Sequence, residues 1–214
     1  MSCIKSFVSD IGSLLHDTDT SDVVLICHGE HIRAHRVILG ARSPVFHAML
    51  HTDMMESKNG EIKIEDVDKD VLKAMIRYMY TVNVDVSFTK FKELIVLADK
   101  YQVLELVNFC GSKLVESLSK DNVLELGQLA EQHNADELLN KCIKYILKNL
   151  PNSLNKDWKN HIKESPKMML KIMQHLLAER TNSKIYDDYH NIRSNANYEE
   201  IKVTTGCPEV TEFL

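Results

Sequence analysis

The spacing of apolar residues predicts a mixed first part of the chain. Residues 4–15 carry apolar side chains at helical spacing, which predicts a short amphipathic helix that needs a surface to pack against. β-Branched residues at 22–27 predict a strand, and residues 28–30 predict a turn into a second strand at 31–34. Together these two segments predict a β-hairpin.

Two helices and a third strand are predicted after the hairpin. Residues 35–41 predict a short helix, and Ser43-Pro44 predicts the start of another, because proline is tolerated at the first helical position. Residues 61–65 alternate between apolar and polar, which predicts a half-buried strand. From Asp70 onward the period is helical. The segment to residue 80 is therefore predicted to be α+β, followed by helices alone.

The helical part contains a repeat at an offset of 32 residues, the separation of Cys110 and Cys142. Each unit predicts two helices joined by a short turn, near Gln102 in the first and near Asn134 in the second. Helix pairs stacked in this way bury a continuous apolar stripe. Any two helical hairpins share leucine spacing, but the matching asparagine and cysteine positions favour a true repeat.

Two prolines delimit the end of the helical part. Pro151 predicts a break, and Pro166 predicts the start of a last helix. Beyond it, residues 181–214 show no sustained period and predict a mostly disordered tail. We therefore expect three parts, which are an α+β domain at 1–118, an all-α helical-hairpin extension at 119–180, and the tail at 181–214.

Composition narrows the classes of protein that fit this pattern. Apolar residues make up 44% of the 214 residues, which is ample for a hydrophobic core. The net charge is -5 with scattered cations, which argues against a nucleic-acid binder. Five cysteines without CxxC spacing favour a reduced, intracellular protein, in the nucleus, the cytoplasm or both. The sequence predicts neither a signal peptide nor a membrane span.

Candidate chemistry is sparse. Cys27, His28, His31 and His35 resemble a metal cluster, but in the predicted hairpin His28 and His31 face solvent and Cys27 ends a strand, so we expect no metal site. The sequence contains no GxSxG elbow, HExxH, Walker loop or dinucleotide fingerprint. We therefore predict neither a catalytic residue nor a cofactor, and a protein that is not an enzyme.

Several spaced motifs occur together along the first half of the chain. In chain order they are Asp22-Val23, His31-Ile32-Arg33-Ala34-His35-Arg36-Val37-Ile38-Leu39, Ala41-Arg42-Ser43-Pro44-Val45-Phe46, Met49, Tyr78-Met79-Tyr80-Thr81 and Leu97-Ala98-Asp99-Lys100-Tyr101. These motifs resemble the BTB/POZ family, and the resemblance covers about residues 8–180. Within that family, Met54-Met55-Glu56-Ser57-Lys58, Trp158-Lys159 and Ser165-Pro166 are most similar to the speckle-type POZ group.

The resemblance implies a BTB/POZ fold, in which a small sheet is flanked by helices, and a set of sites. It implies a structural pair of Asp22 and His35, which we expect to share a charge-assisted hydrogen bond. It implies a homodimer in which the N-terminal helix packs across a two-fold axis. It also implies cullin-3 binding through a hydrophobic-x-Glu element. The implied residues are Val8, Ile11, Leu14, Leu15 and Ile38 for the dimer, and Met54, Glu56, Tyr101 and Leu104 for the cullin.

Two departures from the family pattern affect these expectations. Val82 stands where family members usually carry glycine after Tyr-Thr, which puts the local turn geometry in doubt. The speckle-type proteins also have a substrate-binding MATH domain before the BTB domain. We expect the MATH domain to be absent here, because Met1 lies only a few residues before the predicted BTB domain.

Two functions fit this sequence. The first is a homodimeric adaptor that joins an unidentified substrate protein to a cullin-3 RING ubiquitin ligase. The second is a non-catalytic dimerisation protein, either a transcriptional co-regulator or a truncated competitor of full-length MATH-BTB adaptors. We expect neither nucleic acid nor membrane among the partners.

Overall fold

The computed structural model describes residues 2–51, 60–149 and 165–178. The chain divides into two compact units, Met1–Lys171 and Ile172–Leu214, and residues 172–178 are helical in the second. The predicted tail, Met54, Glu56, Pro151 and Trp158 lie outside the described residues.

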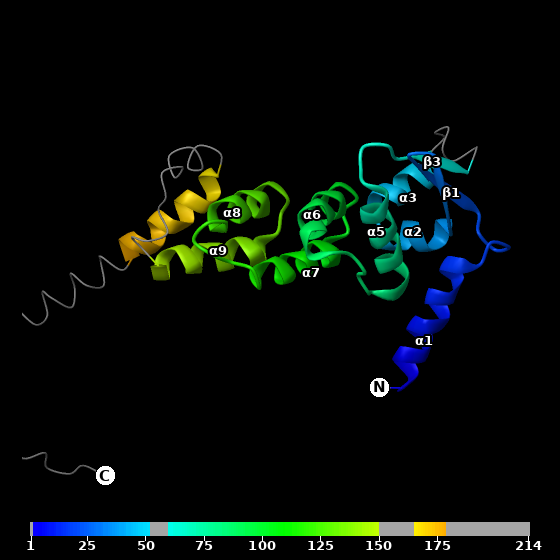
Figure 1. The fold of residues 1–214 in the computed structure, drawn as a ribbon, viewed down its shortest axis with the longest axis horizontal. Coiled ribbons are helices and arrows are strands. Elements are labelled where there is room, and N and C mark those ends of the chain that lie inside the picture. Colours follow the sequence, from blue (N-terminus) through cyan, green and yellow to red (C-terminus); the bar gives the residue numbers. More distant parts are fainter. Residues whose placement is uncertain (1, 52–59, 150–164, 179–214) are drawn as a thin grey trace, which may run out of the picture. The chain divides into compact units, whose positions relative to one another are not determined.

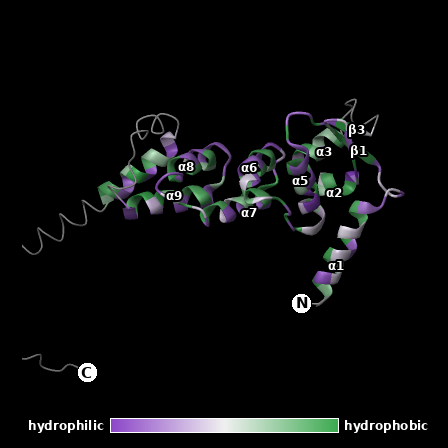
Figure 2. Ribbon diagram, in the orientation of Figure 1, coloured by the Kyte–Doolittle hydropathy of each residue, from purple (hydrophilic) through white to green (hydrophobic). Residues whose placement is uncertain are grey.

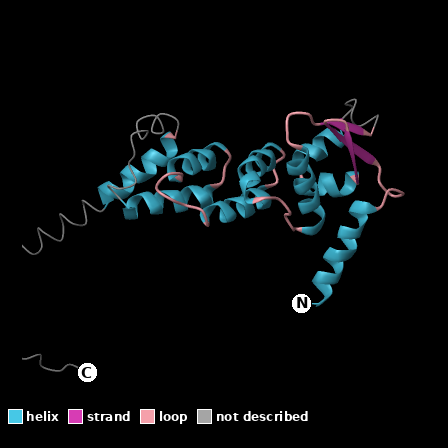
Figure 3. Cartoon of the chain, in the orientation of Figure 1, coloured by secondary structure: helices cyan, strands magenta, loops and turns pink. Residues whose placement is uncertain are grey.

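The first unit contains a small sheet, drawn in magenta in Figure 3. Its three strands lie in the order β2-β1-β3. β1 (Val23–Cys27) pairs antiparallel with β2 (Glu30–Ala34) and parallel with β3 (Glu61–Lys63). The hairpin turns through His28 and Gly29, which have φ values of 47° and 79°. A two-residue turn with two positive φ values matches the twist of the flanking strands. The predicted hairpin and third strand are thus confirmed, although β3 is shorter than predicted.

Helices cover this sheet. The most buried is α5, whose first turn is capped by Asp68, because its carboxylate accepts hydrogen bonds from the backbone N–H groups of Asp70 and Val71. Figure 2 shows apolar and polar residues mixed along α1, as expected for an amphipathic surface helix. The helices of this part are α1 (Ser2–Ser13), the 3₁₀ turn η1 (Leu14–His16), α2 (Arg36–Arg42), α3 (Pro44–His51) and α5 (Lys69–Thr81).

The predicted Ser-Pro helix start is confirmed. Ser43 is buried, and its Oγ accepts a hydrogen bond from the backbone N–H of Phe46 at 3.1 Å. The same hydroxyl donates to the backbone carbonyl of Tyr101 at 2.6 Å. The rings of Phe46 and Tyr101 stack with centroids 4.5 Å apart. One hydroxyl therefore caps α3 and ties it to the first helical hairpin.

The 32-residue repeat is confirmed as two helical hairpins, visible side by side in Figure 1. Both turns use a left-handed residue at the same place, with φ of 55° at Gln102 and 56° at Asn134. Burial raises the pKa of the thiols of Cys110 and Cys142 to about 12, so both cysteines act as apolar core residues. The repeat helices are α6 (Phe91–Lys100) and α7 (Leu104–Val115), then α8 (Val123–Gln132) and α9 (Asp136–Asn149).

Specific contacts join the two hairpins and the last helix. Gly111 on α7 lies close to Leu138 on α9, because an added Cβ would come within 3.3 Å of the Leu138 Cβ. The predicted helix at Pro166 is confirmed over 166–178. The carboxylate of Glu131 accepts hydrogen bonds from the first backbone N–H groups of that helix, at Lys167 and Met168, each at 2.8 Å. A carboxylate at a helix N-terminus is favourable for both hydrogen bonding and the helix dipole.

Val82 keeps the turn that glycine would usually make. It ends α5 in the left-handed conformation, with φ of 59°, and its N–H donates to the carbonyl of Tyr78 at 2.8 Å. The turn geometry therefore survives without glycine. A β-branched residue in this region is strained, since its Cβ crowds the following carbonyl.

We expect Val82→Gly to stabilise the protein. Relief of left-handed strain is worth ~1–2 kcal/mol, partly offset by ~0.5–1 kcal/mol of extra glycine entropy in the unfolded chain, which leaves about 0.5–1 kcal/mol. Urea unfolding monitored by circular dichroism measures the change. Val84→Gly is the matched control and should be destabilising, because Val84 does not have a positive φ. Equal losses in both variants would contradict strain at Val82.

Candidate functional site

The histidines and cysteine of the hairpin do not gather around one point. Cys27 is buried at the end of β1, whereas His28 and His31 are exposed as predicted. The His28 ring nitrogen Nε2 lies 3.0 Å from the carbonyl oxygen of Val67. Across the described ranges, no three His, Cys, Asp or Glu side chains are arranged to hold a metal ion.

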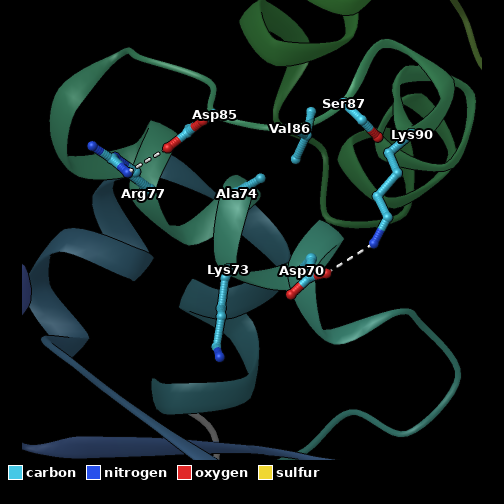
Figure 4. A pocket seen from close by; sticks show the side chains of 8 residues that line it. All are labelled: Asp70, Lys73, Ala74, Arg77, Asp85, Val86, Ser87 and Lys90. Atoms are coloured by element: carbon cyan, nitrogen blue, oxygen red, sulfur yellow. Dashed lines mark hydrogen bonds and ion pairs between the residues drawn. The ribbon is translucent and has the colours of Figure 1, made fainter.

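A pocket of about 430 Å³ lies between α5 and the segment that follows it (Figure 4). Its charged side chains are paired with one another: Arg77 with Asp85 at 3.1 Å, and Lys90 with Asp70 at 3.0 Å. Lys73, also on its lining, pairs with Glu30. Opposite charges in contact neutralise each other's field, so this pocket offers little unpaired charge to a ligand.

The predicted dimer residues of α1 and η1 follow helical spacing, which places them on one apolar strip that one chain covers only in part. Every member is half-buried, as expected for side chains that face both their own core and another surface. Two residues of the same helix outside the predicted set, Ile4 and Phe7, are 73% and 63% exposed. They belong to the same helical periodicity in the sequence, which could have identified them. The predicted set is Val8, Ile11, Leu14 and Leu15 on α1 and η1, with Ile38 on α2.

The predicted cullin-binding residues divide into three groups. Met54 and Glu56 lie outside the described residues. Leu104, at the start of α7, is 58% exposed beside a pocket of about 470 Å³ that also touches Pro44 and His47 of α3. The expectation that Tyr101 is exposed to a partner differs from the structure of the single chain, in which Tyr101 is 2% exposed and stacked on Phe46 in the core. Its side chain therefore positions α3 and is covered within the single chain.

The predicted pair of Asp22 and His35 also needs correction. The two residues come close, since the Asp22 N–H donates to the carbonyl of Ala34, but they do not share a hydrogen bond. The Asp22 carboxylate accepts from the backbone N–H of Arg36 at 2.8 Å instead. Both ring nitrogens of His35 have other partners: Nδ1 lies 2.9 Å from the Tyr80 hydroxyl, and Nε2 lies 2.9 Å from the Thr20 hydroxyl.

These contacts form a directed chain of hydrogen bonds. The Tyr80 hydroxyl accepts from the backbone N–H of His35 at 2.8 Å, which leaves its own hydrogen to donate to Nδ1. Nε2–H then donates to Thr20, whose hydroxyl donates to the Asp17 carboxylate at 2.7 Å and lowers its pKa. This assignment of the hydrogens satisfies every donor in the chain. Burial raises the pKa of Tyr80 to about 12, so it remains a donor at neutral pH.

An apolar strip on α1 and an exposed leucine beside the Ser-Pro helix, on a small sheet covered by helices, are features of a protein-interaction domain. The sequence profile of the BTB/POZ domain family matches residues 11–118. A BTB/POZ domain-containing protein of Arabidopsis thaliana, At4g08455, is 33% identical over 189 residues, which cover 83% of this chain and 78% of the relative. The chain therefore belongs to the BTB/POZ family.

Solved BTB domains resemble the chain at lower identity. The BTB domain of human Gigaxonin is 19% identical with a TM-score of 0.44, over 50% of this chain and 86% of that domain. The BTB domain of zebrafish PATZ1 is also 19% identical, with a TM-score of 0.45, over 53% of this chain and 92% of that domain. The predicted fold class is confirmed, with a small mixed sheet, flanking helices and further helices after the domain.

Family membership defines the broad activity of the chain. BTB/POZ domains are protein-interaction modules, which generally self-associate or bind other proteins and are generally not enzymes. Among the helices that the structure describes, none is both long and apolar enough to cross a membrane.

We expect Tyr80→Phe to destabilise the fold by about 1–3 kcal/mol, because it leaves the buried backbone N–H and the Nδ1 atom of His35 without their partner. Chemical denaturation gives the free energy of unfolding. The control is Tyr145→Phe, which removes a hydroxyl from a half-buried tyrosine on α9. If the two substitutions cost the same, the Tyr80 hydroxyl does not have the structural importance assigned to it.

Proposed function

We propose that the protein is a homodimeric adaptor for a cullin-3 RING ubiquitin ligase, and that within the BTB/POZ family it is most similar to the speckle-type group. The observation that carries this proposal is the surface at the start of α7. There, Leu104 is exposed beside Pro44 and His47, next to the helix that leads into Met54-Met55-Glu56. An exposed apolar side chain at the edge of a pocket is a typical anchor of a protein interface.

We propose that the predicted domains have different roles. Residues 1–118 would supply the dimer and the cullin contacts, and the helical extension at 119–180 would support further self-association. Met54 would fill an apolar pocket on the cullin, while Glu56 would accept hydrogen bonds from it. Substrate choice would depend on regions other than these surfaces.

The alternative function is a dimerisation protein without a ligase, either a transcriptional co-regulator or a competitor of MATH-BTB adaptors. The exposed apolar residues of α1 favour self-association under both proposals, because Ile4 and Phe7 remain uncovered in the single chain. Cullin-3 binding separates the two functions.

The dimer is tested by changing Val8, Ile11 and Leu15 together to glutamine. We expect the mass in solution to fall from twice 24.6 kDa to 24.6 kDa by light scattering, because polar side chains remove the apolar driving force for association. Since these residues are half-buried, the exposed pair Ile4→Gln and Phe7→Gln provides a second variant that leaves the core intact. Leu104→Gln, an exposed apolar residue on α7, is the matched control and should remain dimeric. A wild-type protein of 24.6 kDa would refute the dimer.

Cullin binding is tested by calorimetric titration of the N-terminal domain of cullin-3 into wild type and the Met54→Ala/Glu56→Ala variant. Losing a charged hydrogen bond costs roughly 1.5–3 kcal/mol, and losing an apolar anchor costs about 1–3 kcal/mol. The two neighbours need not add, so we expect a loss of about tenfold or more. Leu104→Ala should weaken binding as well.

The control for this titration removes the same residue types elsewhere. Met173→Ala/Glu137→Ala changes an exposed methionine and an exposed glutamate in the helical extension, and should leave affinity unchanged. Wild type without heat of binding at roughly tens of micromolar would refute the adaptor and favour the alternative. Equal binding by wild type and the Met54/Glu56 variant would refute that site alone. Thermal melts show that each variant is folded.

A further inference from the structure

β2 is an edge strand whose outer side is not paired within the sheet. The backbone N–H of Val24 and the carbonyl of Ile26 form hydrogen bonds on the β3 side of β1. Alternate residues of β1 must therefore bond to β2, in the pairs Val23–Ala34, Leu25–Ile32 and Cys27–Glu30. It follows that the main-chain groups of His31 and Arg33 point away from β1.

These outward groups are available for another strand. None of the hydrogen bonds within the described ranges involves the backbone N–H or C=O of His31 or Arg33. Together they offer two donors and two acceptors at strand spacing. An edge of this kind can be extended by a peptide that adds a further strand.

A pocket of about 370 Å³ runs beside this edge. Three successive residues of β2, His31, Ile32 and Arg33, form one wall, and the remaining walls come from η1 and α5. Leu15, Ile32 and Ile76 supply an apolar floor. The other lining residues are His16, Lys73 and Arg77, so every titratable group on the lining is basic.

The basic groups differ in how far they are already neutralised. Lys73 and Arg77 pair with Glu30 and Asp85, which lie outside the lining. Arg33 is exposed, and no carboxylate among the described residues pairs with it. The guanidinium is always charged and forms paired hydrogen bonds with carboxylates. A local positive site is therefore left on a chain whose net charge is -5.

We propose that the outer edge of β2 binds an extended, acidic segment of a partner protein by strand addition. Main-chain hydrogen bonds to His31 and Arg33 would give the segment its register. Every second side chain of the bound segment would then face the apolar floor of the pocket. The acidic side chains between them would lie close to the guanidinium of Arg33. A second copy of this chain is a poor occupant, because its own β2 would bring Arg33 and His31 against the same positive rim.

The test is fluorescence anisotropy with the full chain and a labelled seven-residue peptide that alternates glutamate and valine, at low salt. We expect saturable binding that Arg33→Glu weakens by about tenfold or more, since it replaces attraction with repulsion. Lys63→Glu is the matched control. It makes the same charge change at an exposed position on β3, at the far side of the sheet, and should alter affinity less than about twofold, as expected for a distant exposed charge.

Two peptide controls separate strand addition from general attraction to positive charge. The same peptide with an N-methyl group on every residue has no main-chain N–H to donate to the edge, and we expect it not to bind. A lysine-valine peptide of equal length should not bind either. The proposal is overturned if the glutamate-valine peptide does not bind, if the N-methylated peptide binds equally well, or if Arg33→Glu and Lys63→Glu have equal effects. Thermal melts confirm that both protein variants are folded.

Discussion

A buried tyrosine hydroxyl holds the end of β2 and the start of α2 against α5. Tyr80 bonds both the backbone and the ring of His35, and through that ring it reaches the segment that follows α1. The direction of β2, the entry angle of α2 and the path leading from α1 therefore all depend on one side chain of α5. Such a polar contact inside a core fixes geometry that apolar packing alone would leave adjustable.

The three surfaces proposed to bind partners differ in their physical character. The strip on α1 is apolar and suits a partner that buries area. The surface at Leu104 combines one exposed apolar side chain with the rigid Ser-Pro helix, held by the Ser43 hydroxyl. The edge of β2 presents main-chain groups and positive charge. The three proposed surfaces thus depend on different forces, although Leu15 belongs both to the predicted dimer set and to the lining of the pocket beside β2.

Periodicity in the sequence was enough to predict the helices, the hairpin and the repeat, because spacing directly reports which side of an element is buried. Partner choice between distant residues was not predictable in the same way. The link of His35 to Tyr80 spans 45 positions, and Tyr101 looks like a surface residue until α3 is placed against it. The exposed edge of β2 likewise depends on strand order, which no local pattern contains. Val82 shows the opposite case, in which the surroundings impose a conformation that the residue itself disfavours.

The matched left-handed residues Gln102 and Asn134 make the helical part modular. Each hairpin has a left-handed residue at the same place in its turn, and the two hairpins contact each other through α7 and α9. A further hairpin with the same turn could therefore pack in the same way. In such an array the stability of each module depends on adjacent modules only. Duplication or loss of the second 32-residue module would then lengthen or shorten the helical part by a fixed step, while the sheet and the Leu104 surface of the first module stayed as they are.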